Sequence, residues 1–239
     1  MSQVTRAIVL SALKYGDSSL IVKLFTDAQG LQTFMVRGVL KPRKGKFKAG
    51  LFLPLTQLEI SAAAPPKGKM GYLREASISY PYVSIHTDVR KSSVIMFLSE
   101  ILTQSIREES PNPELFQYLE HTLQWLDHQD HVANFHLRFL LGLTRYLGFY
   151  PDQTDAHAPY FDLQEGAFVQ SQPLNPMLTG ELLEDFNELL GTKFDALERV
   201  KLTQKRRRAL IKALVLYFQI HLHGFREPRS LDVLDEVFS

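Results

Sequence analysis

Residues 20–36, LIVKLFTDAQGLQTFMV, decide the fold of the first part of the chain. The stretch holds two apolar runs, residues 20–25 and 31–36, and the turn-forming residues 27–30 separate them. Short apolar runs bounded by turn residues are typical of β-strands joined by a tight connection. The stretch therefore predicts two neighbouring strands.

The same pattern continues on both sides of this stretch. Residues 4–13 alternate before it, and residues 52–60 and 70–78 form two further runs after it. Turn residues at 15–18, 38–50 and 64–68 separate the runs. We expect five short strands, which favours a small barrel over a sandwich because a sandwich usually needs about seven strands. A five-stranded Greek-key barrel is the OB-fold pattern, so residues 1–80 are predicted to be an OB-fold β-barrel domain that binds nucleic acid.

After Pro81 the apolar residues recur every three or four positions, which indicates helices. Helices are expected at 88–107, from 113 onward, and at 132–147, 179–190, 203–223 and 231–237. An irregular insert at about 152–176 interrupts them, and residues 160–162 and 166–168 in it are expected to pair as a hairpin. The fold class is thus α+β, with an all-α helical domain at residues 81–239.

Charge is distributed unevenly along the chain. The first eighty residues hold twelve Lys and Arg against four Asp and Glu, a formal charge of +8, whereas the whole chain carries only +1. The remaining residues therefore carry −7. Such an asymmetry indicates two domains and a polyanionic partner for the basic one.

The densest basic segment is the loop at residues 41–48, KPRKGKFK. Its cations can reach successive phosphates, and Phe47 can stack on an unpaired base. The alternative is a solvated loop whose charges only increase solubility. Other basic residues support the binding reading, because Lys67 and Lys69 lie in the other long loop and Lys23, Phe34 and Arg37 lie on the strands that form the OB groove. The predicted DNA-binding residues are Lys23, Phe34, Arg37, Lys41, Arg43, Lys44, Lys46, Phe47, Lys48, Lys67 and Lys69.

A second basic cluster opens the helix expected at 203–223. Cations at a helix start oppose the helix dipole, so the cluster points to an anion site that backbone N–H groups would complete. The alternative is pairing with acids such as Glu181, Glu184 and Asp185. We favour the anion site, formed by Lys205, Arg206, Arg207, Arg208 and Lys212.

Signals for metals and catalysis are weak. The chain has no cysteine, which excludes disulfides, a Cys nucleophile and Cys-ligated zinc. Asp152, Asp155 and His157 are too few ligands for a metal site, and no nucleotide-loop or hydrolase motif is present. No signal peptide and no apolar run of about 20 residues is found. We expect no metal, no cofactor, no enzymatic activity, no membrane partner and a cytoplasmic location.

Several segments, in order, resemble the bacterial RecO family of recombination mediators and DNA-annealing proteins. The N-terminal matches are YGDS at 15–18, VKLFT at 22–26 with Gly30, RGVLK at 37–41 and FLPL at 52–55. The helical matches are FLLGL at 139–143, LGFYP at 147–151, FDL at 161–163 with Gly166, and RSL at 229–231 with Leu234. Together they cover nearly the whole chain.

The resemblance implies an OB-fold joined to a helical domain that binds single- and double-stranded DNA and anneals complementary strands. It also implies a RecR-type partner, binding of the C-terminal tail of single-strand-binding protein, indirect action on RecA, and a nucleoid-associated role in DNA damage repair by the RecF pathway. In many members four cysteines in the insert hold zinc; this chain has none, so zinc is not carried over.

Two alternatives remain open. One is an OB-fold RNA- or DNA-binding module without annealing activity, and the other is a protein-interaction scaffold. Under the family reading, the cluster at 205–208 is a candidate for a second DNA strand or for the tail of single-strand-binding protein.

Overall fold

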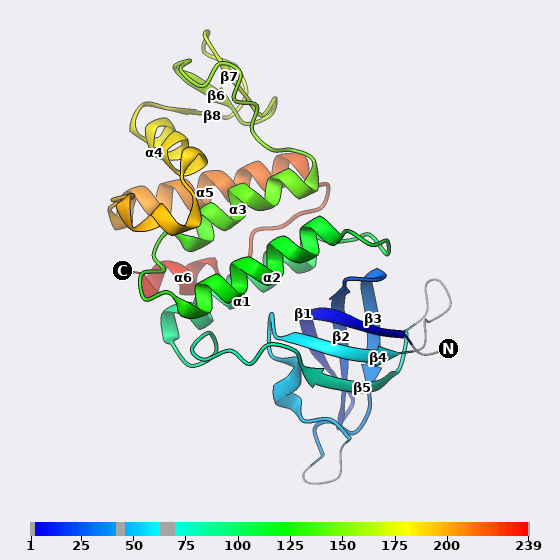
Figure 1. The fold of residues 1–239 in the computed structure, drawn as a ribbon. Helices are drawn as coiled ribbons and strands as arrows, with labels where there is room; N and C mark the ends of the chain where they lie inside the picture. The colour runs from blue at the N-terminus through cyan, green and yellow to red at the C-terminus, as the bar shows by residue number, and fades with distance from the viewer. Residues whose placement is uncertain (1–2, 42–45, 63–69, 239) are drawn as a thin grey trace. The chain divides into compact units, whose positions relative to one another are not determined.

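The computed structural model describes residues 3–41, 46–62 and 70–238, and it forms two compact units, Met1–His128 and Gln129–Ser239 (Figure 1). The first unit contains the predicted strands together with the first two helices. The helices join the strands in one unit because they pack on the sheet, as described below. The assignment of residues 1–80 as the DNA-binding domain stays a prediction.

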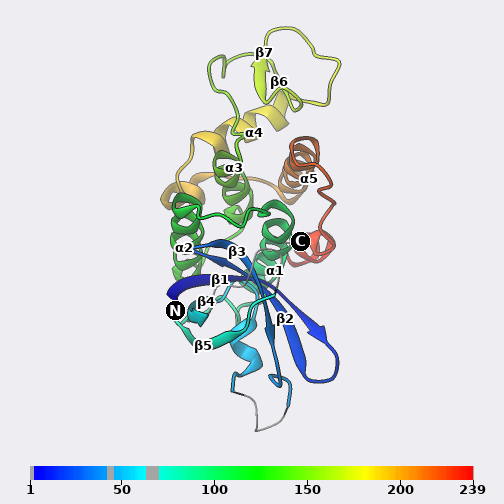
Figure 2. The same ribbon diagram turned by 90° about the vertical axis from the view of Figure 1, so that its right-hand side faces the viewer.

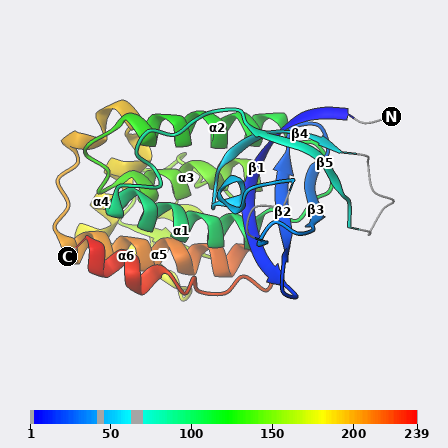
Figure 3. The same cartoon turned by 90° about the horizontal axis from the view of Figure 1, so that it is seen from below.

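Five antiparallel strands form the sheet of the first unit (Figure 3). They are β1 (Gln3–Tyr15), β2 (Ser19–Thr26), β3 (Gly30–Val36), β4 (Gln57–Ala62) and β5 (Leu73–Ile78), hydrogen-bonded in the order β3-β2-β1-β4-β5. The two edges meet where Gly71 forms a parallel bridge with Phe34. Here Met35 N donates to Gly71 O at 3.0 Å and Gly71 N donates to Thr33 O at 2.8 Å. The predicted OB-like architecture is confirmed, but this bridge, not a continuous ladder, joins the described edges, so the sheet is a partly open barrel.

The start predicted for the fourth strand is wrong. Instead of a strand from residue 52, the chain forms the 3₁₀ helix η1 (Ala49–Phe52), and β4 begins at Gln57. Leu55 has a positive φ of 56°, and its N–H donates to Val9 O at 2.7 Å. Phe52 and Leu55 are buried as a strand's residues would be, so their apolar run did not distinguish a strand from a buried turn. Similarly, β5 begins at Leu73 and not at residue 70, because Gly71 pairs with β3.

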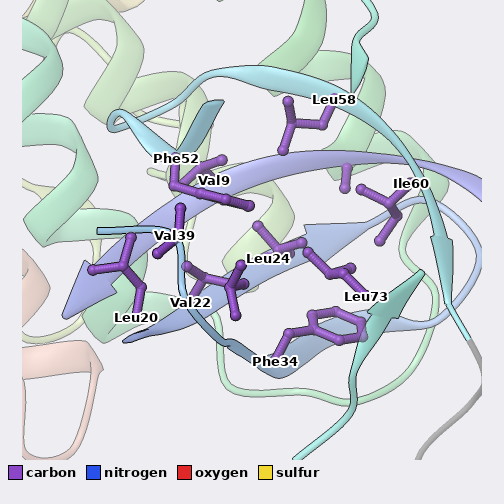
Figure 4. Close-up of a cluster of buried hydrophobic side chains, with 12 residues drawn as sticks. Val9, Leu20, Val22, Leu24, Phe34, Val39, Phe52, Leu58, Ile60 and Leu73 are labelled. Carbon is purple, nitrogen blue, oxygen red and sulfur yellow. The ribbon is translucent and has the colours of Figure 1, made fainter. Parts of the chain in front are cut away.

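Alternate residues of the strands form the core inside the sheet (Figure 4). Leu20, Val22 and Leu24 come from β2, and Phe34 and Val36 come from β3. Further core residues are Ala7, Val9, Val39, Phe52, Leu58, Ile60 and Leu73. Each strand therefore has one face in this core, and the residues between them point outward.

Two helices cover part of the outer face of the sheet. They are α1 (Val89–Ser105), which begins after the N-cap Asp88 as the sequence predicts, and α2 (Pro113–His128). Ser99 and Thr103 of α1 both donate to Leu10 O, and Phe116 of α2 packs on Phe25 with ring centroids 5.9 Å apart. These contacts bury the outer face at Leu10 and Phe25.

Asp127, near the end of α2, holds the segment that leads from the sheet into α1. Its carboxylate accepts the backbone N–H groups of Val83, Ser84 and Ile85 at 2.8–2.9 Å. Buried Lys91 donates to Ser84 Oγ and to Asp127 O at 2.6 and 2.7 Å. Burial raises the pKa of Asp127, but the backbone donors outweigh burial and hold the pKa below its ordinary value.

The second unit contains four α-helices and a small sheet (Figure 2). The helices are α3 (Phe135–Leu147), α4 (Gly180–Gly191), α5 (Gln204–His221) and α6 (Leu231–Val237), with the 3₁₀ helix η2 (Phe194–Arg199) before α5. The helices lie close to the predicted ranges, and Gly148 ends α3 with a φ of 85°, a conformation that favours glycine.

The insert forms the small sheet of this unit. Strands β6 (Tyr160–Asp162) and β7 (Ala167–Val169) form the predicted hairpin, and β8 (Met177–Thr179), which the sequence did not indicate, pairs with the other edge of β6. Aromatic packing attaches the sheet to the helices. The Phe161 ring lies 4.8 Å from the rings of Phe168 and of Phe186 in α4, and 5.9 Å from Tyr217 in α5.

Candidate nucleic-acid interface

The described cations of the basic loop are exposed. Lys41, Lys46 and Lys48 all have exposed side chains, and within the part of the chain that the structure describes they form no ion pair. Arg43 and Lys44 of the same loop, and Lys67 and Lys69 of the second predicted loop, lie outside the described residues. The three described lysines therefore offer full charges to solvent, as phosphate contacts require.

Phe34 does not belong to this surface, which corrects one predicted site residue. Its side chain is 1% exposed and lies in the core. The reason is the strand register: Phe34 pairs with Val22, whereas Lys23 pairs with Thr33. Because successive side chains point to opposite faces, Lys23 and Phe34 cannot share a surface. Lys23 keeps the outward position, half-buried among its neighbours.

The outer face around Lys23 carries apolar side chains that the sequence reasoning missed. Leu13 of β1 pairs with Ile21 of β2, which in turn pairs with Met35 of β3. Each of these residues lies two positions from Lys23 or from one of its cross-strand partners, so the row shares its face. Leu13 is 63% exposed, and Ile21 and Met35 are half-buried. Apolar groups beside a cation suit unpaired bases and their phosphates.

Arg37 and Tyr72 form a second feature of this face. Arg37, just after β3, donates from Nη2 to the Tyr72 hydroxyl at 3.1 Å, and its guanidinium carbon lies 5.1 Å from the centroid of the Tyr72 ring. Tyr72 is 54% exposed. It follows Gly71, whose bridge to Phe34 brings this residue beside β3. The sequence did not single out Tyr72, although an aromatic residue shortly after the basic loop was a signal that could have found it.

Phe47, the predicted stacking residue of the basic loop, is half-buried. Its ring packs edge-on against core residue Phe52 at 6.2 Å, and the Lys46 ammonium lies 5.8 Å from its centroid. Part of the ring is therefore used in packing. Its role as a stacking surface stays a prediction.

The basic residues at the start of α5 do not form one open anion site. Arg206 forms an ion pair with Asp185 of α4, and Arg208 forms one with Asp235 of α6. Arg207 is half-buried and donates to Asn134 Oδ1 and Leu202 O. The structure thus favours the alternative of internal pairing for these arginines. Lys205 and Lys212 are exposed, with no ion pair among the described residues.

A cavity of about 390 Å³ lies beside this cluster. Lys201, Arg207 and His131 supply basic groups to its wall, and Leu197 and Val200 supply apolar ones. It therefore combines positive charge with apolar surface, which suits an apolar group that carries a carboxylate.

The structure offers no cluster of metal ligands. Within residues 3–41, 46–62 and 70–238, no three His, Asp or Glu side chains come together as a metal ion would require. Asp152 instead accepts hydrogen bonds from the N–H and hydroxyl of Thr154, which lower the pKa of Asp152. None of the helices, within the described ranges, is long and apolar enough to cross a membrane.

Two family models together match almost the entire chain. "Recombination protein O N terminal" matches residues 1–82, and "Recombination protein O C terminal" matches residues 86–231. Individual relatives match at full length. Proteins named DNA repair protein RecO from Christiangramia forsetii and Flavobacterium psychrophilum are 49% and 45% identical to this chain, with 98% of each chain covered. One from Phocaeicola vulgatus is 37% identical, with 100% of both chains covered.

Proposed function

The chain belongs to the RecO family of DNA repair proteins, and from this premise we propose that it binds DNA and anneals complementary strands as a recombination mediator. The observation that carries the proposal is the set of unpaired cations on its first unit. Lys23, Arg37, Lys41, Lys46 and Lys48 form no ion pair among the described residues.

Annealing follows from this arrangement without covalent chemistry. Two DNA strands repel each other until their phosphates are neutralised, and cations that bind phosphate release the condensed counterions. A surface that binds backbone without reading sequence lets two strands test many registers. No catalytic group is needed, so we propose that the protein acts as a non-enzymatic mediator.

An annealing assay with matched variants tests the proposal. Replacement of Lys41, Lys46 and Lys48 by Gln should slow the pairing of labelled complementary strands and reduce the salt dependence of DNA binding by roughly 0.7–0.9 in log–log slope per lost contact. A control that replaces Arg145, Lys193 and Arg199, all exposed residues of the second unit, removes the same charge. Equal effects of the two triple variants would show that only net charge matters, and this would contradict the proposed surface.

The cavity beside α5 supports a second proposal for a partner. We propose that it holds the acidic C-terminal tail of single-strand-binding protein, with Lys201 and Arg207 near the terminal carboxylate and Leu197 and Val200 against apolar side chains. Fluorescence anisotropy with the free-acid tail peptide and with its C-terminal amide tests this. Lys201→Gln should weaken the free acid more than the amide. Equal weakening of both, or of neither, would refute the site.

The remaining partners are proposed from family membership. We propose a RecR-type partner and assistance in loading a RecA-type recombinase on single-stranded DNA coated with single-strand-binding protein. Recombinase loading on coated strands, measured with and without this chain and the RecR-type protein, tests both. Loading that does not depend on this chain would reject them.

A further inference from the structure

We infer that Tyr72, held by Arg37, is a stacking platform for an unpaired base and gives the protein a preference for single-stranded over duplex DNA. This inference rests on the proposed DNA-binding function. It starts from three observations: a 54% exposed ring, a guanidinium carbon 5.1 Å from its centroid, and a hydrogen bond of 3.1 Å to its hydroxyl.

The backbone around Tyr72 is well anchored for such a role. Gly71 exchanges hydrogen bonds with Thr33 and Met35 of β3, and Leu73 enters the core at 9% exposure. Because Leu73 points inward, Tyr72 between them points outward. A ring fixed on both sides of the chain loses little freedom when a base stacks on it, so stacking is not offset by a large entropy cost.

Arg37 adds orientation and charge. Its guanidinium donates one N–H group to the Tyr72 hydroxyl and makes no other hydrogen bond within the described residues. An arginine has five N–H donors in a planar fork, so the others can take a phosphate while the ring contact persists. A base on Tyr72 and its phosphate on Arg37 would thus be bound by neighbouring side chains.

The pair selects single strands because only an unpaired base exposes its face. In a duplex the bases are stacked on each other, and Tyr72 would have to unstack them first. Phosphate contacts at Lys41, Lys46 and Lys48 are available to both forms of DNA. The ring contact is therefore the part of the surface that discriminates between them. Phe47 is less suited to this role because it packs on Phe52.

The test compares Tyr72→Ala with Tyr72→Phe and with Tyr15→Ala. Tyr15 is a matched control because it is 55% exposed on the same sheet and has no ring or hydrogen-bond partner within the described residues. Affinities for a labelled single strand and for a duplex of the same length are measured by anisotropy at several salt concentrations. Thermal unfolding of each variant shows that the fold is kept.

Tyr72→Ala should weaken single-strand binding by roughly 5- to 150-fold, the usual effect of removing one stacking ring. Duplex affinity and the salt slope should stay unchanged, because no charge is removed. Tyr72→Phe and Tyr15→Ala should resemble the original protein. On a single strand whose positions are abasic, Tyr72→Ala should lose its effect, because the phosphates remain but the bases are gone.

The inference is overturned if Tyr72→Ala leaves single-strand affinity unchanged, weakens both DNA forms equally, or matches Tyr15→Ala. Such a result leaves the proposed function standing, provided that the lysine triple variant still loses affinity and salt slope. Conversely, if the original protein binds neither DNA form, the proposed function fails, and this inference fails with it.

Discussion

Arg206 of α5 and Asp185 of α4 form a two-pronged ion pair, with Arg206 Nε 2.8 Å from Asp185 Oδ2 and Nη2 donating to Oδ1. The Asp185 side chain is only 2% exposed. A buried carboxylate needs its partner, because charge taken from water must be compensated. The basic run at the start of α5 is therefore in part structural.

Removing Arg206 should destabilise the protein. Arg206→Ala leaves the Asp185 carboxylate without its guanidinium, so the midpoint of thermal unfolding should fall by roughly several degrees. The double variant Arg206→Ala/Asp185→Asn should recover part of this loss because it removes the buried charge. Circular dichroism melting curves of the two variants measure the difference. An unchanged midpoint for Arg206→Ala would contradict a structural role for the pair.

Lys23 and Phe34 should respond to substitution in opposite ways. Phe34→Ala removes a core ring and should cost about 3–5 kcal/mol of unfolding free energy. Lys23→Ala should leave stability nearly unchanged while it lowers the salt slope of DNA binding by roughly 0.7–0.9. Urea unfolding and salt titrations of DNA affinity test the pair. If Phe34→Ala instead weakened DNA binding in a fully stable protein, the strand register described above would be wrong.

Gly30 should be irreplaceable in the turn between β2 and β3. Its φ is +67°, and a Cβ atom there would lie 2.2 Å from Ser110 O. Gly30→Ala combines backbone strain of about 1–3 kcal/mol with a backbone overlap that the structure must move to relieve. Gly16, at φ +60° with no atom within 4 Å of its virtual Cβ, is the matched control. Gly16→Ala should cost strain alone, and equal losses in urea unfolding would exclude the steric contribution.

His136 should make the protein less stable in mild acid. Burial, and then the charge of Arg207, lower the pKa of His136 to about 3, whereas the unfolded chain titrates near 6.5. Between these values the unfolded state binds the proton and the folded state does not, so unfolding free energy falls as pH falls, by at most about 1.4 kcal/mol per pH unit. His136→Gln should flatten this dependence between pH 6.5 and 3. Urea unfolding at several pH values measures it; an unaltered slope in the variant would assign the acid sensitivity to other groups.

The helices and strands could be predicted largely from local pattern. Asp88 caps α1 and Thr203 caps α5 through hydrogen bonds from the first-turn N–H groups, as expected from residue type and position. The hairpin of β6 and β7 was likewise evident from two short apolar runs around Gly166. The prediction failed where an apolar run was buried without being a strand, as at Phe52 and Leu55.

The candidate site was predicted less completely. Lys41, Lys46 and Lys48 were identified from composition alone, and they are exposed. Phe34 was placed on the wrong face because β3 holds Phe34 and Met35 side by side, and either could have faced the core. Only pairing with Val22 decides which one does. Tyr72 was missed because its importance comes from the bridge of Gly71 to β3, a contact across a long sequence separation.

The sequence by itself determined the order of strands and helices and the excess of positive charge in the first eighty residues, because both follow from residue type and short-range periodicity. The tertiary structure decided which charges are available to a partner. The cations near the sheet lie without acidic partners among the described residues, whereas Arg206 and Arg208 meet Asp185 and Asp235 from other helices. The physical reason is that net charge is a sum over residues, but binding depends on which charges are already compensated by neighbours that folding brings together.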